Sequence, residues 1–414
     1  MSKLKDIAYI TKLAGFEHTK YIQGNCTHEK QNDDDKPLFI GKTVRNGNID
    51  KNFDWFISSK ISEELPRSQL NKKCIVLPYV GSVGDLAIFD GTYKAHLGSN
   101  IAKLELNDNC EFSEEFIYYY LKSPFGQKNL LKDIQGAVQK NITMDAIRNV
   151  EIPNIEKSKQ TKIVNMLLGL DKKILNNNNI ISELESMAKT IYDYWFLQYE
   201  FPNEEGKPYK SSGGKMVYNE SLKREIPIGW TVGTLSDIAN FIMGQSPKSS
   251  AYNELGKGLP LINGAVELTS SGIDINKYTT EYNRVCKVND LLFCIRATLG
   301  NIQFADREYC LGRGVASARP KEEMYVEYAY QVLNYMISYF ESVLSGSIIV
   351  GMTKDNIADF TTIIPPKDIM DKYHNVSKDS LITCRRLKDE NKELQNLRDY
   401  LLPLLMNGQV SFKS

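Results

Sequence analysis

Two long stretches of this chain carry apolar residues at alternating intervals of three and four positions, which is the pattern of helices that pack side by side. The first stripe consists of Ile163, Leu167, Leu170, Ile174, Ile181, Leu184, Ala188, Ile191 and Trp195. The second consists of Val376, Leu387, Leu394, Leu397, Leu401 and Leu404, and its matching positions lie 213 residues after those of the first. An amphipathic helix must bury its stripe, so the shared register predicts that the two helices pack on each other.

Each stripe is interrupted by a polar residue at the same position, Asn177 in the first and Glu390 in the second. A polar group at a core position of a helix pair lowers stability and often fixes the register of the two helices. The alternative is that the stripe drifts slightly and leaves both residues exposed.

The segments before the two helices are also similar to each other. Leu4 to Ala8 (LKDIA) returns as Leu235 to Ala239 (LSDIA), and Cys74–Lys103 can be laid over Asp290–Arg319 without a gap. The second alignment places Tyr93 over Tyr309 and Gly98 over Gly314. Repeats of this length are duplicated domains. Short apolar runs mixed with short helical patterns indicate an α+β fold with a pseudo-twofold internal repeat and antiparallel helices.

Turn residues and prolines predict five segments. The first domain covers 1–155 and the first long helix 156–198. A connector rich in Gly, Pro and Ser follows at 199–229 and is expected to be exposed. The second domain covers 230–365, and the second long helix 366–410 ends near Gly408. Ser113 is predicted to cap a short helix that stops near Pro124.

Composition limits the function without defining it. The chain of 414 residues has a formal net charge of zero and no apolar stretch long enough to cross a membrane, and we expect it in the cytoplasm. Its seven cysteines are scattered without a Cys-x-x-Cys pair, and its four histidines lie far apart, so no metal site is predicted. A neutral chain can still bind nucleic acid if its charges are segregated.

Several local motifs were weighed for chemistry. Gly41-Lys42-Thr43 is similar to the end of a phosphate-binding loop, but residue 36 is lysine where that loop needs glycine, so a hairpin tip is the better interpretation. Residues 81–85 (GSVGD) and their counterpart 297–301 (ATLGN) suit tight turns that approach a ligand closely. Residues 136–143 and 346–353 contain polar side chains that could contact bases or phosphates, although a solvated loop is an equal alternative.

Signatures of catalysis are missing from the sequence. There is no Asn-Pro-Pro-Tyr or Asp-Pro-Pro-Tyr tetrapeptide for a flipped base, no glycine-rich turn for a nucleoside cofactor and no nucleophile elbow. We therefore expect no catalytic residue and no cofactor in this chain.

The ordered set of features resembles the specificity subunit of a type I restriction-modification enzyme. The features are the LKDIA and LSDIA segments, Ile226–Trp230 (IPIGW) at the start of the second domain, Gln139–Thr143 (QKNIT), Ile152-Pro153 and the helix Ile181–Phe196. The first copy lacks the Pro-x-Gly-Trp start. The second has Ile349–Met352 (IVGM) in place of Gln139–Ile142 (QKNI), which implies a different mode of base readout.

The resemblance implies that two target-recognition domains each bind half of a split DNA sequence in the major groove. The helix pair would fix the unread gap, since 33 residues make a helix of roughly 50 Å. Methylation subunits, two by expectation, would bring S-adenosylmethionine and modify adenine. Restriction subunits would bring ATP and Mg²⁺ and cut the DNA.

The residues predicted to contact DNA are Lys42, Arg45, Ser82, Lys94, Asn100 and Lys140 in the first domain and Gln245, Arg284, Arg296, Arg313 and Lys354 in the second. The helix-packing residues are Ile163, Leu170, Ile174, Asn177, Ile181, Leu184, Ile191, Leu387, Glu390, Leu394, Leu397 and Leu401. The alternative is a coiled-coil adaptor that binds proteins or glycans through apolar pockets, using the 23 tyrosines.

Overall fold

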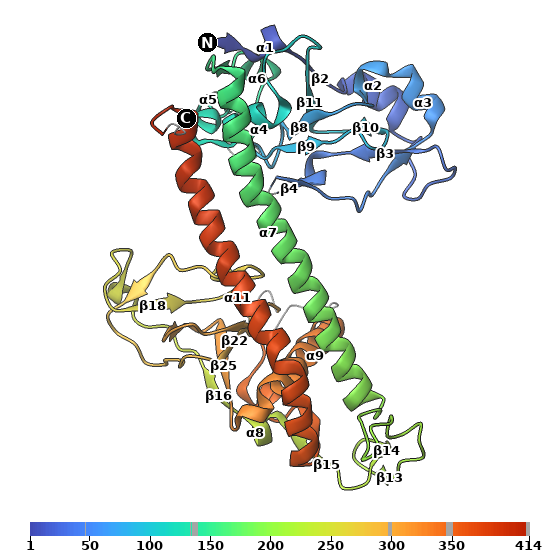
Figure 1. The fold of residues 1–414 in the computed structure, drawn as a ribbon, viewed down its shortest axis with the longest axis vertical. Coiled ribbons are helices and arrows are strands. Elements are labelled where there is room, and N and C mark those ends of the chain that lie inside the picture. Colours follow the sequence, from blue (N-terminus) through green and yellow to red (C-terminus); the bar gives the residue numbers. More distant parts are fainter. Residues whose placement is uncertain (46, 133, 135–139, 297–299, 345–350, 411–414) are drawn as a thin grey trace. The chain divides into compact units, whose positions relative to one another are not determined.

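The computed structural model describes residues 1–45, 47–132, 134, 140–296, 300–344 and 351–410. The chain divides into two compact units. Unit 1 consists of Met1–Lys172 and Asn396–Ser414, and unit 2 of Lys173–Gln395. Each unit therefore combines one mixed domain with a part of both long helices (Figure 1). The predicted α+β class with an internal repeat is confirmed.

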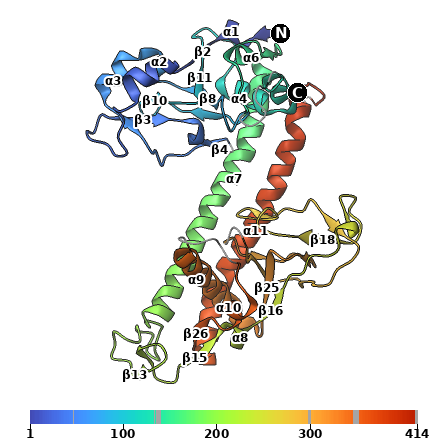
Figure 2. The same cartoon turned by 180° about the vertical axis from the view of Figure 1, so that it is seen from behind.

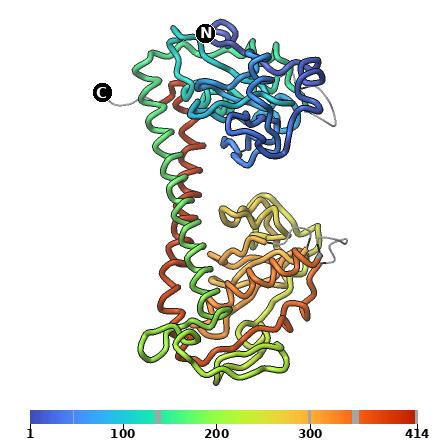
Figure 3. The backbone as a smooth tube through the Cα atoms, turned by 90° about the vertical axis from the view of Figure 1, so that its right-hand side faces the viewer, coloured from blue at the N-terminus to red at the C-terminus, as the bar shows by residue number. Residues whose placement is uncertain are grey.

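The two long helices are continuous elements, α7 (Lys157–Tyr192) and α11 (Lys367–Met406). A π-helical turn, Asp193–Leu197, follows α7. Gly408 has a φ of 69°, so the chain leaves the helical region just after α11, as predicted. Within each unit α7 and α11 lie side by side in all three views (Figures 1, 2 and 3).

Unit 1 contains two four-stranded sheets. The antiparallel sheet has the order β2-β11-β8-β9, and the second sheet has the order β6-β3-β10-β7 with β3 and β10 parallel. The strands are β1 (Ser2–Lys3), β2 (Ala8–Lys12), β3 (Lys36–Phe39), β4 (Val44–Arg45), β5 (Asn48–Ile49), β6 (Phe56–Ile57), β7 (Gln69–Leu70), β8 (Cys74–Pro78), β9 (Ala87–Phe89), β10 (Ala95–Leu97), β11 (Ile101–Leu106) and β12 (Glu151–Ile152).

Unit 1 also contains short helices and helical turns. They are α1 (Leu4–Ile7), α2 (Gly15–Glu17), a π-turn (His18–Ile22), a 3-10 turn (Gly41–Thr43), α3 (Ser59–Glu64), a 3-10 turn (Pro66–Ser68), α4 (Glu114–Lys122), α5 (Pro124–Leu130) and α6 (Met144–Arg148). Helix α4 begins where predicted, because the Ser113 side chain accepts a hydrogen bond from the Phe116 N–H. Pro124 ends that helix and starts α5.

Unit 2 repeats the antiparallel sheet of unit 1 and three strands of its second sheet, because β21-β18-β24 corresponds to β6-β3-β10 while β17 and β7 lie at opposite edges. Its sheets have the orders β16-β25-β22-β23 and β17-β21-β18-β24, and β18 and β24 are parallel. The strands are β13 (Met216–Asn219), β14 (Arg224–Pro227), β15 (Thr231–Thr234), β16 (Ala239–Met243), β17 (Tyr252–Asn253), β18 (Leu259–Ile262), β19 (Leu268–Thr269), β20 (Gly272–Ile273), β21 (Tyr278–Thr279), β22 (Leu291–Cys294), β23 (Gln303–Phe304), β24 (Cys310–Leu311), β25 (Val315–Pro320) and β26 (Thr361–Ile364). The helices are α8 (Leu235–Ile238), a 3-10 turn (Ser249–Ala251), a 3-10 turn (Glu323–Tyr325), α9 (Val326–Leu344) and α10 (Lys354–Ala358).

The gapless alignment of 74–103 with 290–319 is only half right. In matching ladders, Ile75 lies opposite Leu104 and Leu291 lies opposite Ala318. Strand pairing therefore equates Ile75 with Leu291, an offset of 216 residues. The following strands, β11 and β25, are offset by 214, since Ile101 pairs with Pro78 and Val315 with Cys294. The chain between these strands is therefore two residues shorter in unit 2. Gly98 corresponds to Gly312 rather than Gly314, and Tyr93 does not correspond to Tyr309.

The connector at 199–229 is more ordered than predicted. It contains the hairpin of β13 and β14, and its apolar ends pack into the core of unit 2. Phe201 and Ile226 are 4% and 1% exposed, and the Phe201 ring stacks on Trp230 at 5.0 Å between centroids. The expectation of an exposed segment is therefore wrong at these ends, because turn residues were weighed and the flanking aromatic residues were not.

Candidate nucleic-acid interface

Three backbone hydrogen bonds bring separate loops together in unit 1. The Gly98 N–H donates to Phe39 O at 2.6 Å, the Tyr79 N–H to Asn100 O at 3.1 Å, and the Ile142 N–H to Tyr79 O at 2.8 Å. The chain segments that follow β3, β8 and β10, together with residues 140–142, therefore meet at one place. We call residues 40–43, 79–82, 98–100 and 140–142 the unit 1 loop cluster.

The same three bonds recur in unit 2. The Gly312 N–H donates to Ile262 O at 2.8 Å, the Ile295 N–H to Gly314 O at 2.9 Å, and the Met352 N–H to Ile295 O at 2.9 Å. We call residues 244–246, 263–264, 295–296, 312–314 and 351–352 the unit 2 loop cluster. The fold thus builds an equivalent multi-loop surface in both units, although few residues are shared between the two.

Four of the predicted contact residues lie in the unit 1 loop cluster. Lys42, Ser82, Asn100 and Lys140 are all exposed. Lys42 lies in the 3-10 turn after β3 and not at a hairpin tip, and its ammonium group pairs with Asp54 at 2.5 Å. Asn100 has a φ of 65°, a left-handed conformation that asparagine tolerates in tight turns.

Two predicted residues of unit 1 lie outside the cluster. Arg45 is exposed in β4 and pairs with Asn48 across the β4–β5 hairpin. Lys94 lines a separate cavity of about 390 Å³ with Phe53, Phe56 and Tyr93, near the start of β3 rather than its end. Residues 135–139, which include Gln139, lie outside the described part of the chain.

The unit 2 loop cluster contains Gln245, Arg296 and Arg313, and all three are exposed. The Gln245 N–H donates to Leu311 O at 2.8 Å, and the Arg313 N–H donates to Ser246 Oγ at 3.2 Å. These bonds fix the backbone at both residues. Residues 297–299 of the predicted turn at 297–301, and residues 345–350, lie outside the described part of the chain.

Arg284 and Lys354 lie beside this cluster rather than in it. Arg284 O accepts a hydrogen bond from the Leu311 N–H, which anchors the backbone of Arg284 to β24. Lys354 is the first residue of α10, and Thr353 caps that helix by accepting from the Asn356 N–H. Both side chains are exposed.

Lys12 was missed by the sequence reasoning. Its ammonium group lies 4.3 Å from the centroid of the Tyr79 ring, which begins one segment of the unit 1 loop cluster. A lysine over an aromatic ring is held in place and keeps its charge near the surface. The signal in the sequence was the position of Lys12 at the end of β2, which became meaningful once strand order was known.

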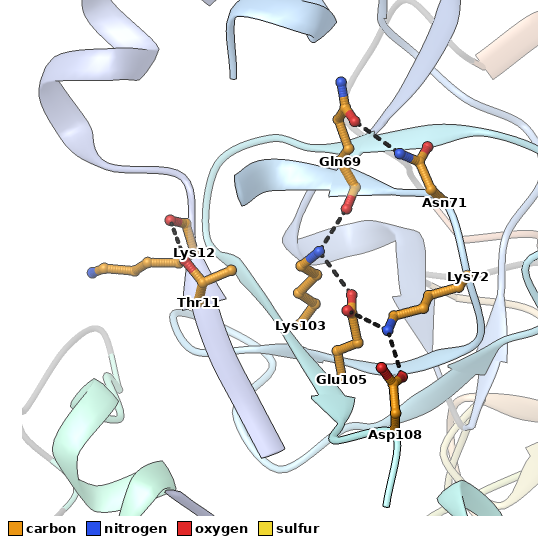
Figure 4. Close-up of polar contacts among 8 residues, drawn as sticks. All are labelled: Thr11, Lys12, Gln69, Asn71, Lys72, Lys103, Glu105 and Asp108. Carbon is orange, nitrogen blue, oxygen red and sulfur yellow. Dashed lines mark hydrogen bonds and ion pairs between the residues drawn. The ribbon is translucent and has the colours of Figure 1, made fainter. Parts of the chain in front are cut away.

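Other basic residues belong to the protein interior. Lys103 is 5% exposed and donates to Gln69 O at 2.7 Å and to Glu105 at 3.0 Å (Figure 4). Burial opposes the charge on Glu105, but its bonds with Lys103 and Lys72 outweigh burial and lower the pKa of that carboxyl group. Figure 4 shows Lys12 apart from this network. Lys103 is therefore a structural residue.

Unit 2 has a different internal ion pair in the corresponding sheet. Arg319 forms a two-pronged ion pair with Asp290, at 2.7 and 2.8 Å. Strand pairing equates Arg319 with Glu105, so the sign of the charge is reversed at equivalent places. Internal charges differ between the units while the ladders are retained.

The polar residues predicted at the helix seam are in contact in unit 2. In unit 2 the Asn177 Nδ2 group donates to Glu390 at 2.8 Å and to Asn391 Oδ1 at 2.9 Å, and Asn391 donates to Asn178 Oδ1 at 2.8 Å. Asn177 is fully buried, so the alternative of an exposed drift is wrong for this residue. Ile181 packs beside Cys384 and Leu387 one turn away.

In unit 1 the remaining parts of the helices run antiparallel in the same way. Ile163, Val164 and Leu167 share a core with Leu402, Leu405 and Met406. Asp171 accepts hydrogen bonds from the Tyr119 hydroxyl at 2.6 Å and from Arg398 at 2.9 Å. The residue numbers rise along α7 as those of the contacted residues fall along α11 in each unit.

The predicted apolar stripe is buried or half-buried along α7 but only along part of α11. Leu170, Ile174, Leu184 and Ile191 are buried or half-buried, as are Leu394 and Leu401. Val376 and Leu397 are instead 52% and 44% exposed. The early turns of α11 bury Ile369, Met370, Tyr373 and Ser377, which leaves Val376 at the edge of the buried face.

Clusters of potential metal ligands and the buried thiols are the two features to consider in the part of the chain that the structure describes. No group of His, Cys, Asp and Glu suited to a metal ion is found among the described residues. Burial raises the pKa of the Cys74 and Cys286 thiols to about 12, and that of Cys294 and Cys384 to about 11. These thiols stay protonated at neutral pH and are poor nucleophiles. No described helix is long and apolar enough to span a bilayer.

Each unit thus presents a polar loop cluster on a domain of the same plan, and each domain packs on a pair of antiparallel helices. The sequence model for the type I restriction modification DNA specificity domain matches residues 1–186 and 227–382. The chain belongs to this family and is a DNA specificity subunit of a restriction-modification system.

Individual relatives agree with this assignment. The chain is 26% identical to the type I restriction enzyme MjaX specificity subunit of Methanocaldococcus jannaschii, over 93% of this chain and 90% of that protein. It is 26% identical to the MjaIX specificity subunit of the same organism, over 72% of this chain and 69% of that protein. The crystal structure of the type I S subunit from M. genitalium has a similar fold, with a TM-score of 0.59, 20% identity, and coverage of 98% and 95% of the two chains.

Proposed function

We propose that the two loop clusters are DNA-reading surfaces, and that each contacts one half of a split target in the major groove. Long exposed side chains on closely packed turns are suited to base edges and phosphates. The observation that carries the proposal is the recurrence of the same three backbone hydrogen bonds in both units, with different side chains in each cluster. In such an arrangement the two loop clusters share a backbone structure but prefer different bases.

The helix pair would set the number of unread base pairs between the half-sites. α7 has 36 residues, or roughly 54 Å at about 1.5 Å per residue, which exceeds one turn of B-DNA. The buried Asn177 contacts support this role, because a polar group paired across helices penalises a change of register.

Catalysis would come from partner subunits in the cytoplasm. Methylation subunits, two in our proposal, would bind S-adenosylmethionine and transfer its methyl group to an adenine in the target. Restriction subunits would hydrolyse ATP with Mg²⁺ and cleave unmodified DNA. This chain would contribute sequence choice alone, and family membership makes this reading better supported than the adaptor alternative.

The test is methylome sequencing of cells that express this chain with its methylation subunit. We expect adenine methylation in a motif of two short conserved blocks separated by a fixed gap. Cells with the methylation subunit alone serve as the control and should lack that motif. A continuous motif, or none, would reject the split-target proposal.

A further inference from the structure

Two exposed arginines leave the unit 2 sheet side by side. The Ile295 N–H donates to Gly314 O at 2.9 Å, so these residues are neighbours in the extension of the β22–β25 ladder. Arg296 follows Ile295 directly and Arg313 directly precedes Gly314. Both side chains therefore start at the same end of the same strand pair.

The backbone beneath Arg313 is tightly packed. A Cβ atom at Gly312 would lie 2.2 Å from Asn263 Oδ1, and one at Gly314 would lie 2.2 Å from Asn263 O. The turn can approach Asn263 this closely because both flanking residues are glycines. With the Arg313 N–H bound to Ser246, the turn holds residue 313 as its one projecting side chain.

Arg296 is positioned by a third glycine. A Cβ atom at Gly351 would lie 2.6 Å from Arg296 Cγ and 2.8 Å from Ile295 O, so the arginine stem lies against the bare backbone of residue 351. The stem is thereby supported while the guanidinium group stays exposed. A side chain supported in this way loses less conformational entropy when it binds.

Neither guanidinium group has an acidic partner among the residues that the structure describes. Other arginines of unit 2 do, as Arg319 pairs with Asp290 and Arg307 with Asp306. Two positive side chains that start from opposing positions of one strand pair, without a counter-charge, favour a ligand with paired acceptor atoms. Guanine presents such acceptors, O6 and N7, in the major groove.

The equivalent places in unit 1 contain no arginine. The bond from the Tyr79 N–H to Asn100 O matches that from Ile295 to Gly314, which equates Arg296 with Val80 and Arg313 with Ser99. The two-guanidinium feature therefore belongs to unit 2 alone.

We propose that Arg296 and Arg313 form a guanine-reading site that is specific to unit 2, so that the half-site read by this unit contains a G·C pair that the pair of arginines requires. This inference rests on the proposed function. It goes further by naming the base class and by predicting that the two half-sites are read with different chemistry.

The test measures the binding of randomised double-stranded DNA by the complex of this chain with its methylation subunit. Arg313→Gln and Arg296→Gln should each relax a guanine requirement in one half-site, by about 5- to 150-fold in relative affinity, from the energy of one bidentate contact. Arg313→Lys keeps the charge but loses the planar fork, and it should relax the same position. Arg307→Gln, an exposed arginine of the same unit, is the matched control and should leave base preference unchanged.

The other half-site acts as an internal standard for folding and assembly, because its base preference should not change in any variant. An equal loss of affinity for every sequence, with a salt dependence reduced by about one ion, would show phosphate contacts and overturn the guanine site. An unchanged preference would overturn it as well. Both results leave a split motif in place, whereas failure of the proposed function would remove the split motif from the wild-type complex.

Discussion

The two units share a strand plan but attach it to the long helices differently. In unit 2 the far side of the domain reaches α11, where the Arg385 guanidinium group lies 4.5 Å from the Phe304 ring centroid and donates to Asn289 at 2.8 Å. Lys392 also donates to Ile273 O at 2.8 Å. In unit 1 the described helix contacts are centred on the apolar cluster around Leu167 and the Asp171 ion pair.

This difference shows which features the two copies share and which features differ between them. Backbone ladders and the bonds that join the loop clusters are kept, because shifting a strand by one residue reverses all of its side chains. Charged side chains on top of those ladders change freely, as the replacement of Glu105 by Arg319 shows. The attachment of the unit 2 domain to α11 depends on side chains of this variable kind.

The largest effect is expected from breaking the internal ion pair of unit 2. Asp290→Ala leaves Arg319 in its partly buried place without a counter-charge and removes the acceptor of the Lys287 N–H. We expect a loss of about 3 kcal/mol in the free energy of unfolding. Hydrogen exchange should rise in β22 and β25, and equal loss of protection in β8 and β11 would contradict the independence of the two networks.

The helix pair gives the next effect. Asn177→Leu removes the donor to Glu390 and Asn391, which should destabilise unit 2 by about 1–2 kcal/mol in chemical denaturation. The double variant Asn177→Leu with Asn391→Leu should recover that loss, because both buried partners become apolar. A double variant that is less stable than the single one would show that the polar layer stabilises the pair.

The attachment of the unit 2 domain to α11 is tested by Arg385→Ala. The loss of the ring contact and of the bond to Asn289 should cost about 1 kcal/mol and raise hydrogen exchange around Phe304. Arg386→Ala, at the next position on α11 and exposed, is the matched control and should change stability by less than about 0.5 kcal/mol. Equal losses of stability in the two variants would show that the Arg385 contacts do not attach the unit 2 domain to α11.

The smallest effect is a pH dependence confined to unit 2. Burial raises the pKa of Glu327, and its bond with His374 at 2.6 Å offsets burial only in part. Folding therefore favours the protonated carboxyl group, and this stabilisation is lost as the pH rises through the raised pKa. Glu327→Gln stays neutral and should flatten the fall in melting temperature of unit 2 over that range. An unchanged pH profile in the variant would contradict this assignment.

The helices and the duplication could be predicted because they leave long periodic signals. The seam of α7, the Asn177 contact and the Ser113 cap follow from spacing and from the identity of single residues. The register between the two copies could not be predicted in full, because a two-residue difference in the chain before β10 and β24 leaves no hydrophobic signal. Strand pairing alone reveals that Gly98 corresponds to Gly312.

The candidate interface was predictable as a set of loops but not residue by residue. Arg296 and Arg313 were chosen for side-chain chemistry, and the structure brings them together through the bond of Ile295 to Gly314. Lys94 has the same chemistry and lies elsewhere, because it precedes β10, whereas residues 98–100 of the loop cluster follow that strand. Whether a lysine or arginine is internal, as Lys103 is, depends on pairings between distant strands.

The glycines on either side of Arg313 have an evolutionary consequence. Neither position can accept a larger residue without displacing Asn263, so drift at this turn is confined to a single codon. Under the proposed guanine site, a change at that codon would alter the base that unit 2 reads while the packing of the turn on Asn263 stays intact.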